Sequence, residues 1–187
     1  PMEYVMSFPA DKAELSKLRA GDKLTVSGTI YTARDAAHKR LTELIASGKE
    51  LPLDIRGAAI YYAGPTPEKP GQVIGSCGPT TSGRMDAYAP GLLDRGLAVM
   101  IGKGDRNAAV IDAIVRNGAV YLAAMGGAGA LMGSCVKAAR IVCYEDLGCE
   151  AIRELKVENM PLTVVIDSQG NDLYKNGPEA YLRSLED

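Results

Sequence analysis

Histidine, tryptophan and paired cysteines are scarce in this 187-residue sequence, which has one histidine, no tryptophan and four cysteines. The lone histidine, His38, excludes a metal site within this chain that needs two histidines. A histidine-based catalytic triad would have to use the same residue. No two cysteines have the C-x-x-C spacing, which favours small buried residues over an iron–sulfur or zinc site built from all four. The cysteines are Cys77, Cys135, Cys143 and Cys149.

An excess of charge of one sign is also absent, because 21 basic and 23 acidic residues give a formal net charge of −2. Without a basic excess, the chain has no electrostatic field that would hold nucleic acid. No apolar run approaches the ~20 residues that would span a bilayer. The N-terminal stretch PMEYVMSFPADKAEL lacks the basic-then-apolar pattern of a secretory signal. We therefore expect a cytoplasmic protein that binds neither nucleic acid nor a membrane.

What the sequence does contain is typical of a globular protein, with 47% apolar and 24% charged residues. Aromatic residues make up only 5%, so the core must consist mainly of Ala, Val, Ile, Leu and Met. Strand-like apolar runs alternate with helical patterns, which predicts an α/β fold with several parallel strands in a mixed sheet. There is no internal repeat or low-complexity tail, and we interpret residues 1–187 as a single domain.

The spacing of the apolar residues predicts the individual elements. The helix around Ala37, Leu41 and Ile45 has clean helical spacing, and Gly48 closes it. The expected strands are Leu24–Thr32, Ala58–Ala63, Val73–Cys77, Ala98–Gly102, Val120–Met125, Ala139–Tyr144 and Leu162–Asp167. The expected helices are Asp11–Leu18, Ala36–Ser47, Met85–Arg95, Arg106–Arg116, Gly129–Lys137, Cys149–Leu155 and Glu179–Leu185.

Three polar segments are expected where a strand leads into a helix: RDAAH, GSCGPTTSGRMD (75–86) and GKGD, the last two with glycines. Ligands of α/β sheets collect at the carboxyl ends of strands, where helix N-termini offer free N–H groups and a partial positive charge. Each segment carries one cation, which is Arg34, Arg84 or Lys103. Three cations with amide donors and hydroxyls would suit a small polyanion, most simply a dicarboxylate.

Each of these residues also has a purely structural interpretation. Arg34 or Arg84 could be a surface ion-pair partner, because Asp35 and Asp86 are close in sequence. Lys103 could be a solvated loop lysine, and the Thr-Thr-Ser run could cap a helix. A phosphate ligand is less favoured, since no G-x-x-x-x-G-K-[ST] motif occurs, and the run GGAGALMG (126–133) is only a near-miss of the dinucleotide motif. The same arrangement at three junctions favours a ligand site.

Six segments together resemble the β-subunit of class I fumarate hydratases, which forms the C-terminal domain of the one-chain members. They are ARDAAHKR (33–40), GPTTSGRMD (78–86), MIGKGDRN (100–107), GGAGAL (126–131), YEDLGCEAI (144–152) and VVIDSQGNDLY (164–174). The matching blocks run in the same order from about residue 28 to 174. The β-subunits of L-tartrate dehydratases are similar, but there a Glu is expected after Arg-Met. Asp86 and Asp105 favour the fumarate hydratase.

The resemblance implies a swivelling β/β/α fold of three layers and the reversible hydration of fumarate to (S)-malate. It implies a [4Fe–4S] cluster held by cysteines of a partner α-subunit and not by this chain, in a heterotetramer of two α- and two β-subunits. Arg34 and Arg84 match the family's substrate-binding arginines, and Lys103 matches its active-site lysine. Thr80 matches the catalytic threonine, and Thr81 its substrate-binding neighbour. The roles of His38 and Cys77 stay open.

The implied chemistry suits these residues. Removal of a proton next to a carboxylate builds up a double negative charge, which Arg34, Arg84 and Lys103 would stabilise. Thr80 is a poor base on its own, so it needs a proton acceptor, which by analogy is a carboxylate of the α-subunit. Two alternatives stay open: a hydro-lyase for L-tartrate or another hydroxy-diacid, and a non-catalytic module that binds a dicarboxylate or serves in assembly.

Overall fold

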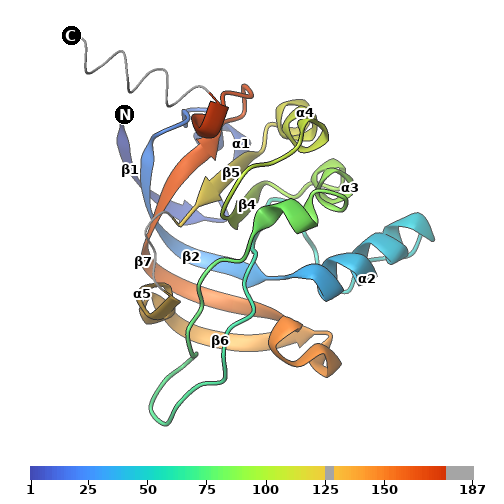
Figure 1. The fold of residues 1–187 in the computed structure, drawn as a ribbon, viewed down its shortest axis with the longest axis vertical. Helices are drawn as coiled ribbons and strands as arrows, with labels where there is room; N and C mark the ends of the chain where they lie inside the picture. Colours follow the sequence, from blue (N-terminus) through green and yellow to red (C-terminus); the bar gives the residue numbers. More distant parts are fainter. Residues whose placement is uncertain (125–128, 176–187) are drawn as a thin grey trace.

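The computed structural model describes residues 1–124 and 129–175 (Figure 1). Strands and helices alternate along most of this part of the chain, and none of the described helices is long and apolar enough to cross a membrane. The elements, in chain order, are β1 (Glu3–Phe8), α1 (Lys12–Leu15), β2 (Lys23–Thr32), α2 (Asp35–Ala46), β3 (Ala59–Tyr61), the 3-10 helix η1 (Ser82–Met85), α3 (Ala89–Asp94), β4 (Val99–Gly102), α4 (Ala108–Asn117), β5 (Val120–Ala123), α5 (Gly129–Ser134), β6 (Val136–Cys143), the 3-10 helix η2 (Glu145–Glu150) and β7 (Ile152–Ile166).

The strands form one mixed sheet with the order β1-β2-β3-β4-β5-β7-β6. Strands β1 to β5 pair in parallel, each with the next. The long strand β7 is antiparallel to β5 and β6, and it also pairs with β2 from Lys23 to Thr32. Because β7 joins β5 back to β2, the strands β2, β3, β4, β5 and β7 form a closed circuit. Closure leaves β1 and β6 as the edge strands.

Alternate residues of the central strands belong to two separate hydrophobic cores. In β3 and its continuation, Ala59 and Tyr61 point into the core inside the closed sheet, whereas Ile60 and Tyr62 point outward. Strand β4 alternates in the same way. A strand buried on both faces needs apolar side chains at every position, and this is why these short strands read as continuous apolar runs.

Helices α2, α3 and α4 cover the outer face of β3, β4 and β5 and bury the second core (Figure 1). The inner core is closed at its ends by Leu15 and Leu18, in and just after α1, and by Met132 of α5. Two β layers around the inner core and one helical layer outside them make three layers. The expected α/β class with a mixed sheet is confirmed.

Several expected elements are wrong. The segment Val73–Cys77 is not a strand, because Thr66 and Ser76 bond across a protruding arm at residues 64–78 instead of pairing with the sheet. The segment Cys149–Leu155 is not a helix, since Ile152 starts strand β7 and pairing with its neighbours overrides local propensity.

Other elements differ in their limits. The helix expected at Met85–Arg95 is divided into η1 and α3, because Pro90 fits only the first turn of a helix. Helix α5 ends at Ser134, before the expected Lys137, and strand β1 has no counterpart among the expected elements. Met125, at the end of one expected strand, and the expected helix Glu179–Leu185 lie outside the described residues.

Candidate active site

The polar segments predicted from the sequence meet at the carboxyl ends of β2, β3 and β4, which are neighbouring parallel strands. The turn that contains Thr80 and Thr81 lies across two of these ends. The Thr80 backbone N–H donates to the Tyr62 carbonyl at 2.7 Å, just beyond β3. Thr81 forms a parallel bridge with Lys103, just beyond β4, and the Ser82 N–H donates to the Lys103 carbonyl at 2.9 Å.

Arg84 brings the side chains of this edge together. Its Nη2 donates to Thr80 Oγ1 at 2.8 Å, and its Nε donates to Asp35 Oδ1 at 2.8 Å. Asp35 is the first residue of α2, directly after the predicted site residue Arg34. Partial burial is the largest single influence and would raise the pKa of Asp35, but the hydrogen bonds from Arg84 and the backbone and the charges of Arg84 and Arg34 together lower this pKa below its usual value. The contacts therefore connect a hydroxyl, a guanidinium and a carboxylate that stays ionised.

Arg34 is the N-cap residue of α2, and its side chain lies close to the Asp35 carboxylate. Its Nε lies 3.7 Å from Asp35 Oδ2 and has no hydrogen-bond partner among the described residues, although it is buried. A Cβ atom at Gly64 would lie about 3 Å from the Arg34 side chain, so the glycine leaves room for the guanidinium. Arg34 thus has unused donor capacity close to Asp35.

The N-terminus of α2 already holds a carboxylate from another part of the chain. The Ala36 N–H donates to Glu150 Oε1, on η2, at 3.2 Å. Free N–H groups and the partial positive charge of a helix N-terminus bind carboxylates. This end of α2 can therefore accept carboxylate oxygens, and a protein side chain occupies part of it.

Thr81 and Lys103 lie next to each other through their backbone bridge, and both are exposed. Thr80 is half-buried and Arg84 has 49% of its side chain exposed. The side chains that touch are those of Thr80, Arg84, Asp35 and Arg34. Among the described residues, no hydrogen bond or ion pair connects the Lys103 ammonium with that group. The site is an open edge with Lys103 beside it.

A buried layer beneath this edge was not predicted. Arg106 has a fully buried side chain, and its Nε donates to Asp86 Oδ1 at 2.7 Å. Its Nη2 donates to the Tyr62 hydroxyl at 3.1 Å, and its guanidinium lies 4.7 Å from the centre of the Tyr121 ring. The other oxygen of Asp86 accepts the Asn107 N–H, at the start of α4. The sequence signal was an arginine just before a capping Asn, but nothing local showed that it is buried.

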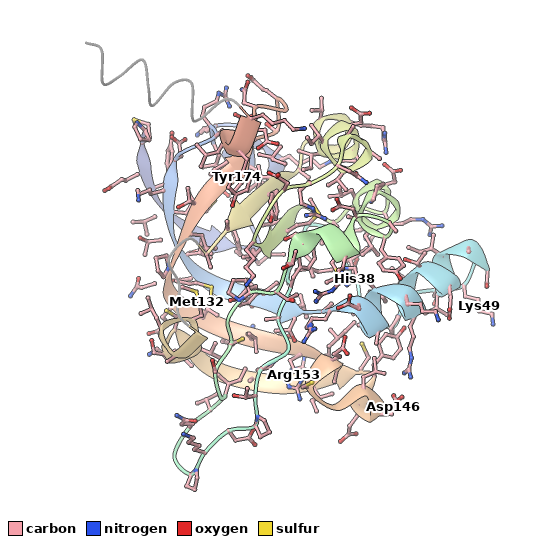
Figure 2. The ribbon with its side chains drawn as sticks, in the orientation of Figure 1. His38, Lys49, Met132, Asp146, Arg153 and Tyr174 are labelled. Carbon is pink, nitrogen blue, oxygen red and sulfur yellow. The ribbon has the colours of Figure 1, made fainter. Side chains whose placement is uncertain are left out.

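His38 lies on the inner side of α2 and is fully buried (Figure 2). Its Nδ1 lies 2.8 Å from the Arg34 carbonyl, which can only accept, so Nδ1 carries a proton and donates it. Burial is the largest influence and lowers the pKa of His38 to about 4, so the ring is neutral at physiological pH. Its edge packs against Tyr62. His38 fixes the backbone from which the Arg34 side chain projects.

The cysteines differ among themselves. Cys77 and Cys135 are buried, Cys143 is half-buried and Cys149 is exposed, so the expectation of small buried residues holds for only some of them. Burial raises the pKa of the Cys77 thiol to about 12, and its carbonyl accepts a hydrogen bond from the Tyr61 hydroxyl. In residues 1–124 and 129–175, no group of three or more His, Cys, Asp or Glu side chains could hold a metal ion.

The arm at residues 64–78 is flanked by two open clefts, of about 390 and 410 Å³. The first lies between the arm and strand β6, and the second between the arm and α5, and the arm extends beyond β6 (Figure 1). Neither cleft is lined by Thr80, Arg84 or Lys103. The hollows near the arm are therefore separate from the polar edge.

Cations, hydroxyls and a helix N-terminus at one edge of a three-layer α/β fold define a domain suited to a small carboxylate-bearing anion. The family described as Fumarase C-terminus matches residues 4–177, and the chain belongs to this family. The anaerobic class I fumarate hydratase of Escherichia coli K12 is 42% identical over 165 residues, which are 87% of this chain and 30% of that protein. The mitochondrial fumarate hydratase 1 of Leishmania major is 39% identical over 170 residues, or 90% of this chain and 31% of that protein.

A third relative has a different length. The putative L(+)-tartrate dehydratase subunit beta of Methanocaldococcus jannaschii is 38% identical over 180 residues, which are 93% of this chain and 92% of that subunit. The chain thus spans about 30% of the length of the fumarate hydratases, but nearly the whole of a separate β-subunit.

Proposed function

We propose that this chain is the β-type part of a class I fumarate hydratase, which catalyses the reversible hydration of fumarate to (S)-malate together with a partner α-subunit. The observation that carries the proposal is the 2.8 Å hydrogen bond from Arg84 to the Thr80 hydroxyl at an open, cation-bearing edge. The six sequence segments that resemble this family support it, and so does the similarity to curated fumarate hydratases.

In this proposal the edge binds the two carboxylates of the substrate. Arg34 has a partly exposed side chain and Lys103 is exposed. Arg84 contacts Asp35 through Nε and Nη2, which leaves Nη1 for a substrate oxygen. The Thr81 hydroxyl is exposed beside them and can hydrogen-bond the substrate. Arginine is suited to this task because its planar fork matches a carboxylate, whereas lysine adds a compact charge.

Thr80 moves the proton at C3 of malate. As the C3–H bond breaks, its electron pair spreads into the adjacent carboxylate, which then carries an additional negative charge. Arg34, Arg84 and Lys103 are in place before that charge develops, which is how fixed cations lower a barrier. In the hydration direction, Thr80 returns the proton to C3. A neutral hydroxyl is a weak base, so the proposal includes a carboxylate base on the partner subunit.

The family implies an oxygen-sensitive [4Fe–4S] cluster, but the described residues offer no ligand set for one. Cys77 and Cys135 are buried in the inner core, and Cys149 is exposed on η2. We therefore assign the cluster to the α-subunit, in a heterotetramer of two α- and two β-subunits. The coverage of a separate β-subunit in a relative supports a partner chain of this kind.

L-tartrate is the second candidate substrate, because the relative that this chain covers almost completely is a putative L(+)-tartrate dehydratase subunit. Asp86, which favours the fumarate hydratase in sequence, accepts hydrogen bonds from the buried Arg106 side chain and from the backbone N–H of Asn107. It would influence substrate choice only through that buried layer. The residue therefore does not decide between the two diacids by contact.

The test is an anaerobic assay of the complex with a cluster-bearing α-subunit, in which the ultraviolet absorbance of fumarate is followed with malate as substrate and L-tartrate is run in parallel. Thr80→Val should reduce kcat by about 10²–10⁴, the typical contribution of a positioned acid–base group, and change KM little. The matched control is Thr81→Val, which should mainly raise KM, because one lost neutral hydrogen bond costs only about 0.5–1.5 kcal/mol.

Three outcomes would contradict the proposal. Turnover of L-tartrate without turnover of malate would make the chain a tartrate dehydratase subunit. Binding of dicarboxylates without any turnover by the loaded complex would make it a binding module. A Thr80→Val complex with unchanged kcat and a raised KM would limit Thr80 to holding the substrate.

A further inference from the structure

Asp35 makes a contact that its place in the sequence does not suggest. It follows Arg34 directly, but its closer partner is Arg84, 49 positions away along the chain. Arg84 Nε donates to Oδ1 at 2.8 Å and Nη2 lies 3.5 Å from Oδ2, whereas Arg34 Nε lies 3.7 Å from Oδ2. Asp35 and Arg84 have 37% and 49% of their side chains exposed. Exposed ion pairs of this kind contribute little to stability, so the pair is better explained by what it orients.

The ion pair acts on Thr80 through the Arg84 guanidinium. Two bonds to one carboxylate fix the plane of a guanidinium, which would otherwise sample many rotamers at an exposed position. In the plane fixed by Asp35, the Nη2 group of Arg84 also donates to Thr80 Oγ1 at 2.8 Å. Thr80 itself is held from the other side, because its backbone N–H donates to the Tyr62 carbonyl. The hydrogen bond is therefore fixed at both of its ends.

The direction of this hydrogen bond has a chemical consequence. A guanidinium has donors and no acceptor, so Thr80 Oγ1 must accept from Arg84. The hydroxyl proton of Thr80 then points away from Arg84 and is available to a base outside this cluster. As that proton leaves, the positive charge on Arg84 stabilises the negative charge that develops on the oxygen.

We propose that Asp35 is a positioning residue, which orients Arg84 so that its guanidinium donates to the Thr80 oxygen and directs the Thr80 proton outward. This inference rests on the proposed function. In malate dehydration, the C3 proton passes to Thr80 Oγ1 and the electron pair of the C3–H bond remains on the substrate. The original hydroxyl proton of Thr80 passes to the carboxylate base of the partner subunit. Asp35 touches neither the substrate nor the moving protons.

The opposite role for Asp35 is that of a competitor, which occupies the fork of Arg84 until the substrate displaces it. The two roles predict different kinetics for Asp35→Asn, which removes the charge but keeps the shape. For a positioning residue, kcat falls by about 10- to 100-fold, part of what a positioned acid–base group contributes, while KM stays the same or rises, because Arg84 also contacts the substrate. For a competitor, KM falls and kcat stays the same.

The kinetic test uses the complete complex with its α-subunit and measures kcat, KM and the exchange of the malate C3 hydrogen with deuterated water. Asp35→Asn should slow turnover and exchange together, and Asp35→Glu should restore a large part of both, because it restores the charge. The matched control is Asp94→Asn, which removes a two-bond pair with Arg116 between α3 and α4 and should leave all three quantities unchanged. A lower KM at unchanged kcat, or kcat equal to that of the control, would overturn the inference.

A second readout does not depend on turnover. In nitrogen-15 NMR spectra of the full chain, the Arg84 Nε–H should be protected from solvent exchange in the wild type and in Thr80→Val, and should lose this protection in Asp35→Asn. Protection that survives Asp35→Asn would overturn the positioning role. If protection behaves as expected but the wild-type complex does not hydrate fumarate, the proposed function fails, while the orientation of Arg84 by Asp35 stands.

Discussion

Arg84 and Arg106 lie in neighbouring turns, and each forms an ion pair with an aspartate, but their surroundings are opposite. Arg84 has 49% of its side chain exposed, and its partners are Asp35 and the Thr80 hydroxyl. Arg106 has none of its side chain exposed, and its guanidinium lies between two tyrosine rings. Its Nε donates a hydrogen bond to Asp86. One arginine belongs to an open polar edge and the other to a closed polar layer directly beneath it.

In the proposed function, this difference separates residues that contact the substrate from residues that support them. The buried Arg106 connects Tyr62, which receives the Thr80 N–H, with Asp86 and the start of α4. The Arg106 side chain is buried and bonded to other protein groups, so it is not accessible to a substrate. Arg84 is accessible to solvent, and its Nη1 has no hydrogen-bond partner within residues 1–124 and 129–175. The closed layer keeps the strand ends in place, and the open edge keeps donor capacity for a ligand.

The largest expected effect tests this difference through stability. Arg106→Met should lower the free energy of unfolding by about 3–5 kcal/mol, because it leaves the mostly buried carboxylate of Asp86 without its charged partner. Arg84→Met should lower it by less than about 1 kcal/mol, since the lost pair is exposed to solvent. Urea unfolding of both variants gives the comparison. Equal losses for the two variants would mean that the layers are not energetically distinct.

The second prediction concerns His38, which connects the two layers. Burial lowers its pKa in the folded chain to about 4, the hydrogen bond to the Arg34 carbonyl and the charge of Asp35 oppose this shift, and the charge of Arg106 adds to it. In the unfolded chain the pKa is about 6.5, so the unfolded state binds more protons between these values. The stability is therefore complete above about pH 6.5 and falls as the pH is lowered toward 4.

The expected loss from His38 is at most about 3 kcal/mol across this window. Urea unfolding at several pH values measures it, and the sequence offers no second histidine that would add to the signal. The control is His38→Asn, which keeps a donor near the position of Nδ1 but does not titrate, so its unfolding free energy should be flatter from pH 6.5 down to about 5. An equal slope in both proteins would assign the pH dependence to the carboxylates.

The parts of the site that the sequence could predict are those encoded by local pattern. Arg34 and Lys103 lie between a strand and a helix, as expected, because an apolar run followed by a capped helical period marks such a junction. The pairing of Arg84 with Asp35 could not be predicted, since the two are 49 positions apart and only the parallel pairing of β2, β3 and β4 brings them together. The burial of Arg106 depends on the same assembly.

The same limit applies to the fold. Helix α2 was predicted almost to its ends because its apolar spacing and closing glycine are local signals. Strand β7 was predicted only at its C-terminal end, because its first residues owe their conformation to pairing with β2 and β6. Within the arm at residues 64–78, the segment Val73–Cys77 resembled a strand because of its apolar residues, but it has no partner strand in the sheet.

The smallest expected effect tests how firmly the closed layer holds the open edge. The Tyr121 hydroxyl donates to the Gly104 carbonyl at 2.9 Å and lies 2.7 Å from Ser82 Oγ, which therefore donates to it. A Cβ atom at Gly102 would collide with Ser82, so the two turns fit closely here. Tyr121→Phe removes both contacts and leaves the fully buried Ser82 hydroxyl without a partner.

Tyr121→Phe should therefore cost about 1–2 kcal/mol of unfolding free energy, the range for a buried polar group that loses its partner. Ser82→Ala should cost less, because the Tyr121 hydroxyl can still donate to Gly104. The double variant should be less destabilised than the sum of the two single variants, since neither hydroxyl is then left behind. Urea unfolding of the three proteins measures this coupling. Strictly additive losses would mean that the two hydroxyls do not interact, and that the backbone contacts of Thr81 and Ser82 with Lys103 connect the turns instead.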